Sequence, residues 1–259
     1  MKLFKCALVL VLLTLFSCTG NDEETTVIPP PVLGGYSPGV VITLDDDYVD
    51  NWVAADDILK VYNWKATFFV TKCSQLNEDK MTKLAAFKAY GHEIGGHGLS
   101  HLNASQFIAA NGANAYLDAE IFPMVDIMDA AGLHATSFAY PFGARNKGTD
   151  DLLLGHFSIL RGTTYGRLSP DQHNCYYTGS PVIFGLGVDN SYPHFNVAYF
   201  ISLLQYAKTN NKIVIFYAHR PVQTALNDYE TEYNTLTQIC KYVKDNDMKF
   251  YTISELTNL

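Results

Sequence analysis

Two histidines four residues apart and a run of three aspartates are the side chains of this sequence best suited to chemistry. His97 and His101 have a spacing that puts both imidazoles on one face of a helical turn, where they can bind one divalent ion. A carboxylate from residues 45–47, about fifty positions earlier, would complete a set of two histidines and one carboxylate with open coordination positions. Such a set is typical of a hydrolytic metal centre. Histidine pairs of this kind also occur on solvated helix faces, so the interpretation depends on the elements that position them.

Short apolar runs alternate with helix-like stretches from residue 37 onward. The runs are rich in β-branched and aromatic residues, as expected of buried parallel strands, and lie at 40–44, 66–70, 93–96, 136–140, 157–160, 182–186, 213–217 and 249–253. Helical periodicity is found at 51–62, 79–90, 115–131, 197–209 and 229–244. This alternation predicts an α/β fold, an irregular (β/α) barrel of about seven parallel strands.

The polar residues with chemical potential follow directly after predicted strands. Residues 45–47 follow the first strand, His97 the third, residues 141–143 the fourth and His219 the seventh. The carboxyl ends of the strands form one rim of such a barrel, and active sites lie at that rim. Polar groups from distant parts of the sequence are therefore predicted to meet in one pocket.

The N-terminal segment has the features of an export and anchoring signal. Residues 1–17 carry two lysines near their start, Lys2 and Lys5, and continue as an apolar run, which is typical of a signal peptide. Leu15-Phe16-Ser17-Cys18 resembles a bacterial lipobox, in which the cysteine is lipidated, and residues 18–36 read as a charged and proline-rich flexible tether. We expect an exported protein anchored by a lipid on Cys18 at the cell envelope, on its periplasmic or cell-surface face. An ordinary cleaved signal peptide is the alternative.

Residues 37–259 show no further change in composition and predict a single domain, expected to be a monomer. Three cysteines remain in it, Cys73, Cys175 and Cys240. This odd, sparse count argues against a disulfide framework and against a cysteine zinc site, and leaves one disulfide open. The net charge of −8 without a basic stripe excludes nucleic acid as an expected partner.

Several motifs, in the predicted order, resemble those of polysaccharide deacetylases of the NodB-homology type, carbohydrate esterase family 4 and its relatives. Thr-Leu-Asp-Asp-Asp at 43–47 resembles the first motif, Thr-Phe-Asp-Asp-Gly, and Gly-His-Glu-Ile-Gly-Gly-His-Gly-Leu-Ser-His at 91–101 resembles the second and its approach. Phe-Ala-Tyr-Pro-Phe-Gly at 138–143 resembles the third, and the strand that leads to His219 the fifth. The resemblance covers residues 40–256. It implies a NodB-like fold and removal of N- or O-linked acetyl groups from a carbohydrate or polysaccharide, whose acetylated form is the expected partner.

The same resemblance implies a role for each motif residue. One divalent metal ion, zinc with cobalt or nickel as alternatives, would be bound by Asp46, His97 and His101. Asp45 would be the general base, and His219 the general acid that protonates the departing amine or alkoxide. The backbone N–H of Phe142 would stabilise the oxyanion. These residue types suit the chemistry independently, because carboxylates accept protons, histidine changes charge near neutral pH and N–H donors stabilise developing negative charge.

Three positions depart from the family pattern. The glycine of the first motif is Asp47, and Ala139 stands where the third motif has an arginine that orients the catalytic aspartate. Arg161, at the end of the fifth predicted strand, is our candidate for that support, with Arg145 as the second choice. The fourth motif, an aspartate- and tryptophan-containing segment that supports the acid histidine, is not recognisable in residues 161–171.

These departures leave two other functions open. The first is a glycan-binding surface lipoprotein with a degenerate deacetylase site and little or no catalysis. The second is a metal hydrolase that acts on amides outside glycans, which rests only on the tolerance of this fold for different chemistries. The presence of every implied ligand, base and acid favours the metal-dependent deacetylase.

Overall fold

The computed structural model describes residues 35–259, which belong to one compact unit. The predicted signal peptide at 1–17, the predicted lipidation site Cys18 and nearly all of the tether predicted for 18–36 lie outside the described residues. No helix among residues 35–259 has the length and apolar character needed to cross a membrane. Cys73, Cys175 and Cys240 are all buried free thiols, so the described part of the chain contains no disulfide.

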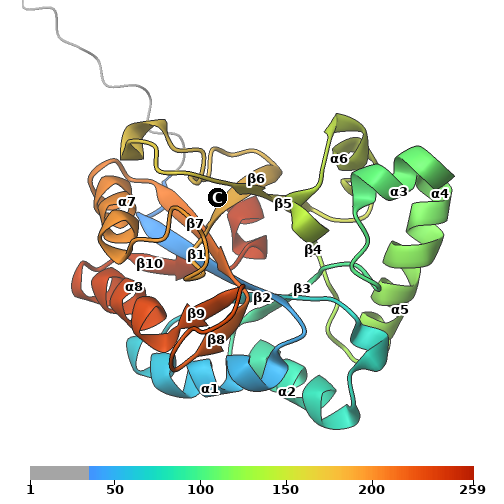
Figure 1. Cartoon of the computed structure of the whole chain (residues 1–259), viewed down its shortest axis with the longest axis horizontal. Helices are drawn as coiled ribbons and strands as arrows, with labels where there is room; N and C mark the ends of the chain where they lie inside the picture. The colour runs from blue at the N-terminus through green and yellow to red at the C-terminus, as the bar shows by residue number, and fades with distance from the viewer. Residues whose placement is uncertain (1–34) are drawn as a thin grey trace, which may run out of the picture. The chain divides into compact units, whose positions relative to one another are not determined.

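Seven parallel strands close into a barrel, as predicted (Figure 1). Each strand pairs with the next in sequence order, and β7 pairs back onto β1 from Gly39↔Ile213 to Leu44↔Ala218. A short eighth strand of the same sheet, β10 (Lys249–Tyr251), pairs with the beginning of β1. The barrel strands are β1 (Gly39–Asp46), β2 (Thr67–Val70), β3 (Glu93–Gly96), β4 (Ser137–Ala139), β5 (Ile159–Thr164), β6 (Val182–Gly187) and β7 (Ile213–Ala218).

The strands are largely apolar because both of their faces are covered. In β1, Val40, Ile42 and Leu44 belong to the large core that the helices share, whereas Val41 belongs to a smaller core formed mainly by strand residues inside the barrel. Successive side chains of a strand point to opposite faces. This alternation sends Asp45 to the same side as Val41, into the barrel.

Helices surround the barrel in Figure 1. They are α1 (Val49–Leu59), α2 (Glu78–Ala89), α3 (Ala104–Asn111), α4 (Ala113–Tyr116), α5 (Phe122–Ala130), α6 (Lys147–Leu153), α7 (Val197–Thr209) and α8 (Tyr233–Asp245). A separate two-stranded sheet, β8 (Arg220–Val222) with β9 (Glu230–Glu232), follows β7. It delays the start of the last helix, which was predicted from residue 229.

The helix predicted over residues 115–131 is not continuous. Between α4 and α5 the chain forms a π-helical segment, Leu117–Ile121. Pro123 follows at the start of α5, and a proline there cannot donate the backbone hydrogen bond of a regular helix. Segments of π-helix are frequent at functional sites, and this one lies against the loop that carries His97 and His101, through a backbone hydrogen bond from Leu99 N to Glu120 O.

Candidate active site

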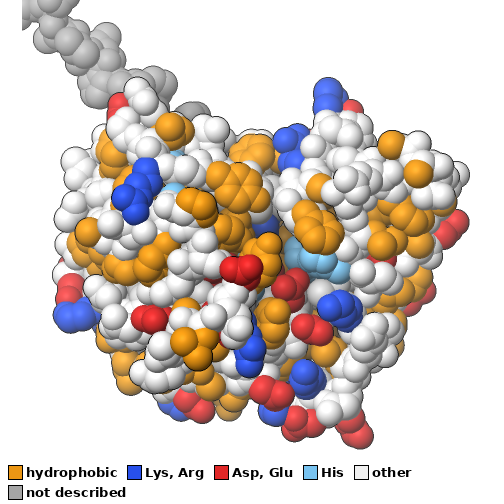
Figure 2. All heavy atoms as spheres, in the orientation of Figure 1, with side chains coloured by type: hydrophobic (Ala, Val, Ile, Leu, Met, Phe, Trp, Pro, Cys, Tyr) orange, Lys and Arg blue, Asp and Glu red, His pale blue; other side chains and the backbone are white. Residues whose placement is uncertain are grey.

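A pocket of about 340 Å³ opens at the carboxyl ends of the strands and brings all seven predicted site residues together. Figure 2 shows histidine and acidic side chains at a hollow between apolar side chains. The predicted residues that line the pocket are Asp45, Asp46, His97, His101, Phe142, Arg161 and His219. The strand-end positions of these side chains place them at one rim, from stretches of sequence up to about 170 residues apart.

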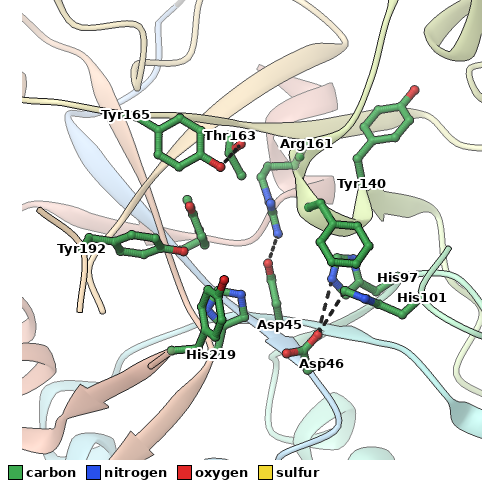
Figure 3. A pocket seen from close by; sticks show the side chains of 14 residues that line it. Asp45, Asp46, His97, His101, Tyr140, Arg161, Thr163, Tyr165, Tyr192 and His219 are labelled. Atoms are coloured by element: carbon green, nitrogen blue, oxygen red, sulfur yellow. Dashed lines mark hydrogen bonds and ion pairs between the residues drawn. The ribbon is translucent and has the colours of Figure 1, made fainter. Parts of the chain in front are cut away.

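Asp46, His97 and His101 form a set of potential metal ligands. One nitrogen or oxygen atom from each lies within 4.8 Å of the other two. Asp46 Oδ1 is 3.7 Å from His97 Nε2 and 3.4 Å from His101 Nε2 (Figure 3). Two imidazole nitrogens and a carboxylate oxygen are the donors of catalytic zinc sites and suit other divalent transition metals. The residues present therefore fit a divalent cation.

The protonation of His97 suits a ligand. Its Nδ1 lies 2.8 Å from the carbonyl oxygen of Ala139, which can only accept, so Nδ1 carries the proton and the lone pair of Nε2 faces Asp46. Burial lowers the pKa of His97 to about 3 and also lowers that of His101. Both imidazoles are therefore neutral at physiological pH, the form that binds metals.

The helical turn predicted for the histidine pair is wrong. His97 to His101 form an irregular loop after β3, with positive φ values of 78° at Gly98 and 62° at His101. An α-helix cannot contain these left-handed conformations. The two imidazoles converge through the path of this loop, with ring centres 4.9 Å apart, and not through helical periodicity.

Strained backbone gathers around the pocket. Nine non-glycine residues have positive φ in the described chain, and four of them line the pocket: Asp46, His101, Phe142 and Tyr229. Each such conformation costs of the order of 1–3 kcal/mol and persists only where neighbouring structure holds it. Asp47 is not among the nine, so the glycine of the family motif is not required at that position. Burial raises the pKa of Asp46 to about 6.

Asp45 and Arg161 form a buried ion pair, with side chains 3% and 1% exposed. Nη2 of Arg161 contacts Oδ2 of Asp45 (Figure 3). The other oxygen, Oδ1, is buried without a hydrogen-bond partner among the described residues. Burial acts to raise the pKa of Asp45, but the Arg161 guanidinium and the nearby histidines outweigh it and leave that pKa below its usual value. Asp45 is thus an ionised carboxylate with one oxygen free at the pocket.

Arg161 comes from the strand next to the one that carries Ala139. The register of β4 and β5 pairs Ala139 with Arg161, and paired residues of parallel strands point to the same face. The small side chain of Ala139 leaves space inside the barrel, where the guanidinium lies 5.4 Å and 5.0 Å from the ring centres of Phe69 and Tyr217. Arg145, the second candidate, pairs with Asp150 instead.

Replacement of Arg161 by methionine should destabilise the fold by about 3–5 kcal/mol, because it leaves the Asp45 charge buried and unpaired. The free energy of unfolding, from urea titration, measures this loss. The double variant Asp45→Asn, Arg161→Met removes both charges and should recover most of the loss. A double variant that is no more stable than Arg161→Met alone would contradict the conclusion that Arg161 neutralises a buried charge on Asp45.

His219 is held by an aspartate that the sequence analysis did not identify. Its Nδ1 lies 2.6 Å from Oδ2 of Asp189, and its backbone N–H donates to Oδ1 at 3.1 Å. Thr231 also donates to Asp189, and Trp52 Nε1 donates to the carbonyl oxygen of His219 at 3.0 Å. Burial alone would lower the pKa of His219, but the charge and hydrogen bond of Asp189 outweigh it and raise that pKa to about 9.

Asp189 lies after β6, whereas the segment that supports the acid histidine was expected within residues 161–171, which begin within β5. Its position directly after a predicted apolar strand could have identified Asp189, because the same rule predicted Asp45, His97 and His219. Two tyrosines of the pocket, Tyr165 and Tyr229, were also missed, since no local pattern marks them. They line the pocket with the predicted Phe142, and the three side chains are 55%, 52% and 64% exposed.

A comparison with models of protein families identifies the first part of the domain. Residues 36–154 match the model described as polysaccharide deacetylase. The match spans 119 of the 259 residues, and this part of the chain is similar to polysaccharide deacetylases. The matched range contains the first three motifs that resemble this family, and with them Asp45, Asp46, His97, His101 and Phe142. A comparison with curated proteins gave no match.

Solved structures with the same fold cover most of the chain. The Xyl-CE4 domain of a multidomain xylanase from the hindgut metagenome of Trinervitermes trinervoides is 17% identical, with a TM-score of 0.57 over 86% of this chain and 91% of that one. The chitin deacetylase of Colletotrichum lindemuthianum is 18% identical, with a TM-score of 0.57 over 85% and 88%. A family 4 acetyl xylan esterase from Clostridium thermocellum, in complex with cobalt, is 20% identical, with a TM-score of 0.54 over 85% and 90%. At these identities the likeness establishes the barrel fold of the family.

Proposed function

We propose that this chain is a metal-dependent hydrolase that removes N- or O-linked acetyl groups from a carbohydrate or polysaccharide. The observation that carries the proposal is the convergence of three functional groups in one pocket. A potential metal-ligand set shares the pocket with an ionised carboxylate, Asp45, and a protonated histidine, His219. A base, an acid and a cation site so arranged are the components of metal-assisted acyl hydrolysis.

Asp46, His97 and His101 would hold the cation, which we propose to be zinc, with cobalt or nickel as alternatives. When bound there, a divalent ion polarises the acyl carbonyl and lowers the pKa of water from 15.7 to about 7. The cobalt complex of the Clostridium thermocellum esterase supports a transition metal in this fold.

The chain's own residues supply the proton transfers. Oδ1 of Asp45 is the free oxygen that accepts a proton from the attacking water, while Arg161 holds the opposite oxygen. His219 is protonated, and because its Nδ1 donates to Asp189, its Nε2 is the nitrogen that gives a proton to the departing amine or alkoxide. The N–H of Phe142 is our candidate for stabilising the oxyanion.

A carbohydrate substrate suits the walls of the pocket. Phe142, Tyr165 and Tyr229 present exposed aromatic side chains at its edge, and aromatic rings offer broad faces with, for tyrosine, a polar group at one end. The similar structures include an acetyl xylan esterase, a chitin deacetylase and a peptidoglycan N-acetylglucosamine deacetylase. These proteins define the substrates to test.

The alternative of a catalytically degenerate glycan-binding protein rested on two missing groups. Arg161 now occupies a position against the proposed base, and Asp189 a position against the proposed acid. Both contacts support catalysis over binding alone.

Acetate release from a panel of substrates tests the proposal. The panel contains N-acetylglucosamine oligomers, peptidoglycan fragments and O-acetyl xylan, each with added zinc, cobalt or nickel. We expect metal-dependent release from at least one class and none after chelation. A metal-bound protein that is inactive on every member would overturn the proposal in favour of the binding function.

Asp189→Asn should shift the alkaline limb of the pH–rate profile. The general acid must be protonated, so activity falls as pH rises through the pKa of His219, which is about 9 with Asp189 in place. Without that charge the pKa falls toward the ordinary value of 6.5, and activity is lost at correspondingly lower pH. The profile of kcat/KM measures the shift, and Asp228→Asn, at an exposed position near β9, is the control. An unchanged alkaline limb would show that His219 is not the acid.

We also propose that the chain is exported and anchored through a lipid on Cys18, from the signal peptide and lipobox resemblance in residues 1–18. Radiolabelled palmitate should label the full chain expressed in a bacterium, and Cys18→Ser should abolish the labelling. Labelling that persists in this variant would contradict the anchor.

A further inference from the structure

The loop with His97 and His101 contacts one buried glutamate that none of the family motifs contains. Glu120 lies in the π-helical segment and is 0% exposed. It forms no ion pair among the described residues, although a buried carboxylate is costly unless strong donors satisfy it. The hydrogen-bond donors around this carboxylate therefore matter for its role.

Both hydrogen bonds to the side chain of Glu120 come from backbone N–H groups of the histidine loop, residues 97–102. Oε1 accepts from the N–H of Ser100 at 2.9 Å, and Oε2 accepts from the N–H of Leu102 at 3.2 Å. The backbone oxygen of Glu120 accepts from the N–H of Leu99 at 3.1 Å. These contacts bracket His101 on both sides in the sequence, so one side chain fixes the backbone on either side of this ligand.

The opposite side of the loop is held by the end of β2. The N–H of His97 donates to the carbonyl of Val70 at 3.0 Å, and Thr71 Oγ1 donates to the carbonyl of Gly98 at 2.8 Å. The N–H of Lys72 also donates to the carbonyl of Leu99 at 3.0 Å, so this side holds the loop from His97 to Leu99. The N–H groups of Ser100 and Leu102, on either side of His101, are held by Glu120.

Gly98 shows how closely the carboxylate fits against the loop. A Cβ atom at this position would lie 2.4 Å from Oε2 of Glu120, and the backbone has a φ of +78°. Glycine is the residue that permits both this conformation and this approach. The loop and the glutamate are therefore fitted to one another.

We propose that Glu120 is a positioning residue that holds His101 in its metal-binding geometry and so sets the affinity of the site for a divalent cation. This inference rests on the proposed metal site. Partners that orient metal ligands from outside the coordination sphere typically contribute about 10- to 100-fold in metal affinity. Glu120 orients His101 by accepting hydrogen bonds from the backbone on either side of it. The carbonyl oxygen of Ala139, in contrast, orients His97 by accepting a hydrogen bond from its imidazole ring.

Glu120→Gln is the decisive variant because it keeps the size of the side chain. Two separate backbone N–H groups donate to the two carboxylate oxygens, so either orientation of an amide sets its NH₂ group against one of these donors. We expect the dissociation constant for zinc, measured by titration calorimetry on the purified chain, to rise about 10- to 100-fold. Gly98→Ala should act in the same direction by displacing Glu120 from the other side.

Glu93→Gln provides the matched control. Glu93 is a carboxylate at the beginning of β3, the end of the strand that lies away from His97, and it accepts hydrogen bonds from Thr67, Ser137 and the N–H of Ser254. Its loss should lower the free energy of unfolding and leave the zinc affinity unchanged. This variant separates loss of fold stability from loss of ligand positioning.

The outcomes distinguish this inference from the proposed function. Weaker zinc binding in Glu120→Gln and Gly98→Ala, with normal binding in Glu93→Gln, supports it. Wild-type affinity in Glu120→Gln overturns the role of Glu120 and leaves the metal site intact. Equal weakening in Glu120→Gln and Glu93→Gln overturns it as well, because fold stability would then explain both. A wild-type chain that binds no zinc, cobalt or nickel overturns the metal site itself.

Discussion

Replacement of His101 by alanine should abolish metal binding and acetate release together. The variant removes one of the three groups whose potential ligand atoms lie within 4.8 Å of one another. Loss of a direct ligand should raise the dissociation constant by more than the roughly 100-fold that an outer-sphere partner can contribute. His97→Ala should have the same effect on the ion, and activity in both variants should fall to the background rate.

The two variants should differ in their effect on the fold. His97 is buried and donates to the carbonyl of Ala139, so its loss leaves a cavity and an unsatisfied carbonyl oxygen that costs about 1–3 kcal/mol. His101 has a side chain that is 23% exposed, which makes His101→Ala the cleaner test. Metal content, acetate release and thermal unfolding should be measured on the same preparations.

His134→Ala is the control for this pair. His134 pairs with Asp129 at an exposed position outside the pocket, and its replacement should leave metal content and rate unchanged. If acetate release persisted in His101→Ala after the ion was lost, metal-assisted hydrolysis would be excluded as the mechanism.

The sequence predicted the strands and the rim residues well because both follow from local patterns. Apolar runs covered on both faces identify parallel strands, and a polar residue directly after such a run must lie at the rim of the barrel. Asp45, His97 and His219 were all found by this rule. Asp189 satisfies it too, after β6, and was missed only because the search was confined to residues 161–171.

The contacts of Arg161 depend on strand register, which no local pattern encodes. An arginine within a strand is as consistent with a solvated edge as with a buried ion pair. Only the pairing of β4 with β5 shows that Arg161 lies beside Ala139 and reaches Asp45. The neighbouring strand thus places an arginine against Asp45, although the third motif itself has Ala139.

The histidine loop and Glu120 show a second limit of local reasoning. A spacing of four residues predicts a helical turn, but backbone hydrogen bonds to β2 and to Glu120 override that preference. Helical periodicity over residues 115–131 likewise gave no sign of the π-helical segment. The histidine loop is held by contacts with segments about twenty to thirty residues away in the sequence, and the π-helical segment supplies some of them.

Asp45→Asn should retain the metal ion and lose turnover. Asparagine keeps an oxygen that can accept the hydrogen bond from Arg161, but its amide cannot take a proton from water at neutral pH. Removal of a general base typically lowers the rate by about 10²- to 10⁴-fold. Steady-state kinetics with added zinc, together with zinc titration, measures both quantities.

Asp47→Asn is the matched control for this variant. Asp47 belongs to the same run of aspartates but does not line the pocket. The rate of acetate release by the Asp47→Asn variant should therefore stay close to that of the wild type. Zinc binding that is lost in Asp45→Asn would identify Asp45 as a ligand and not as the base. A rate that survives with the metal bound would move the role of base elsewhere. The free Oδ1 atom of Asp45 would then require another explanation, because a buried carboxylate oxygen without a donor is costly unless a reacting molecule supplies one.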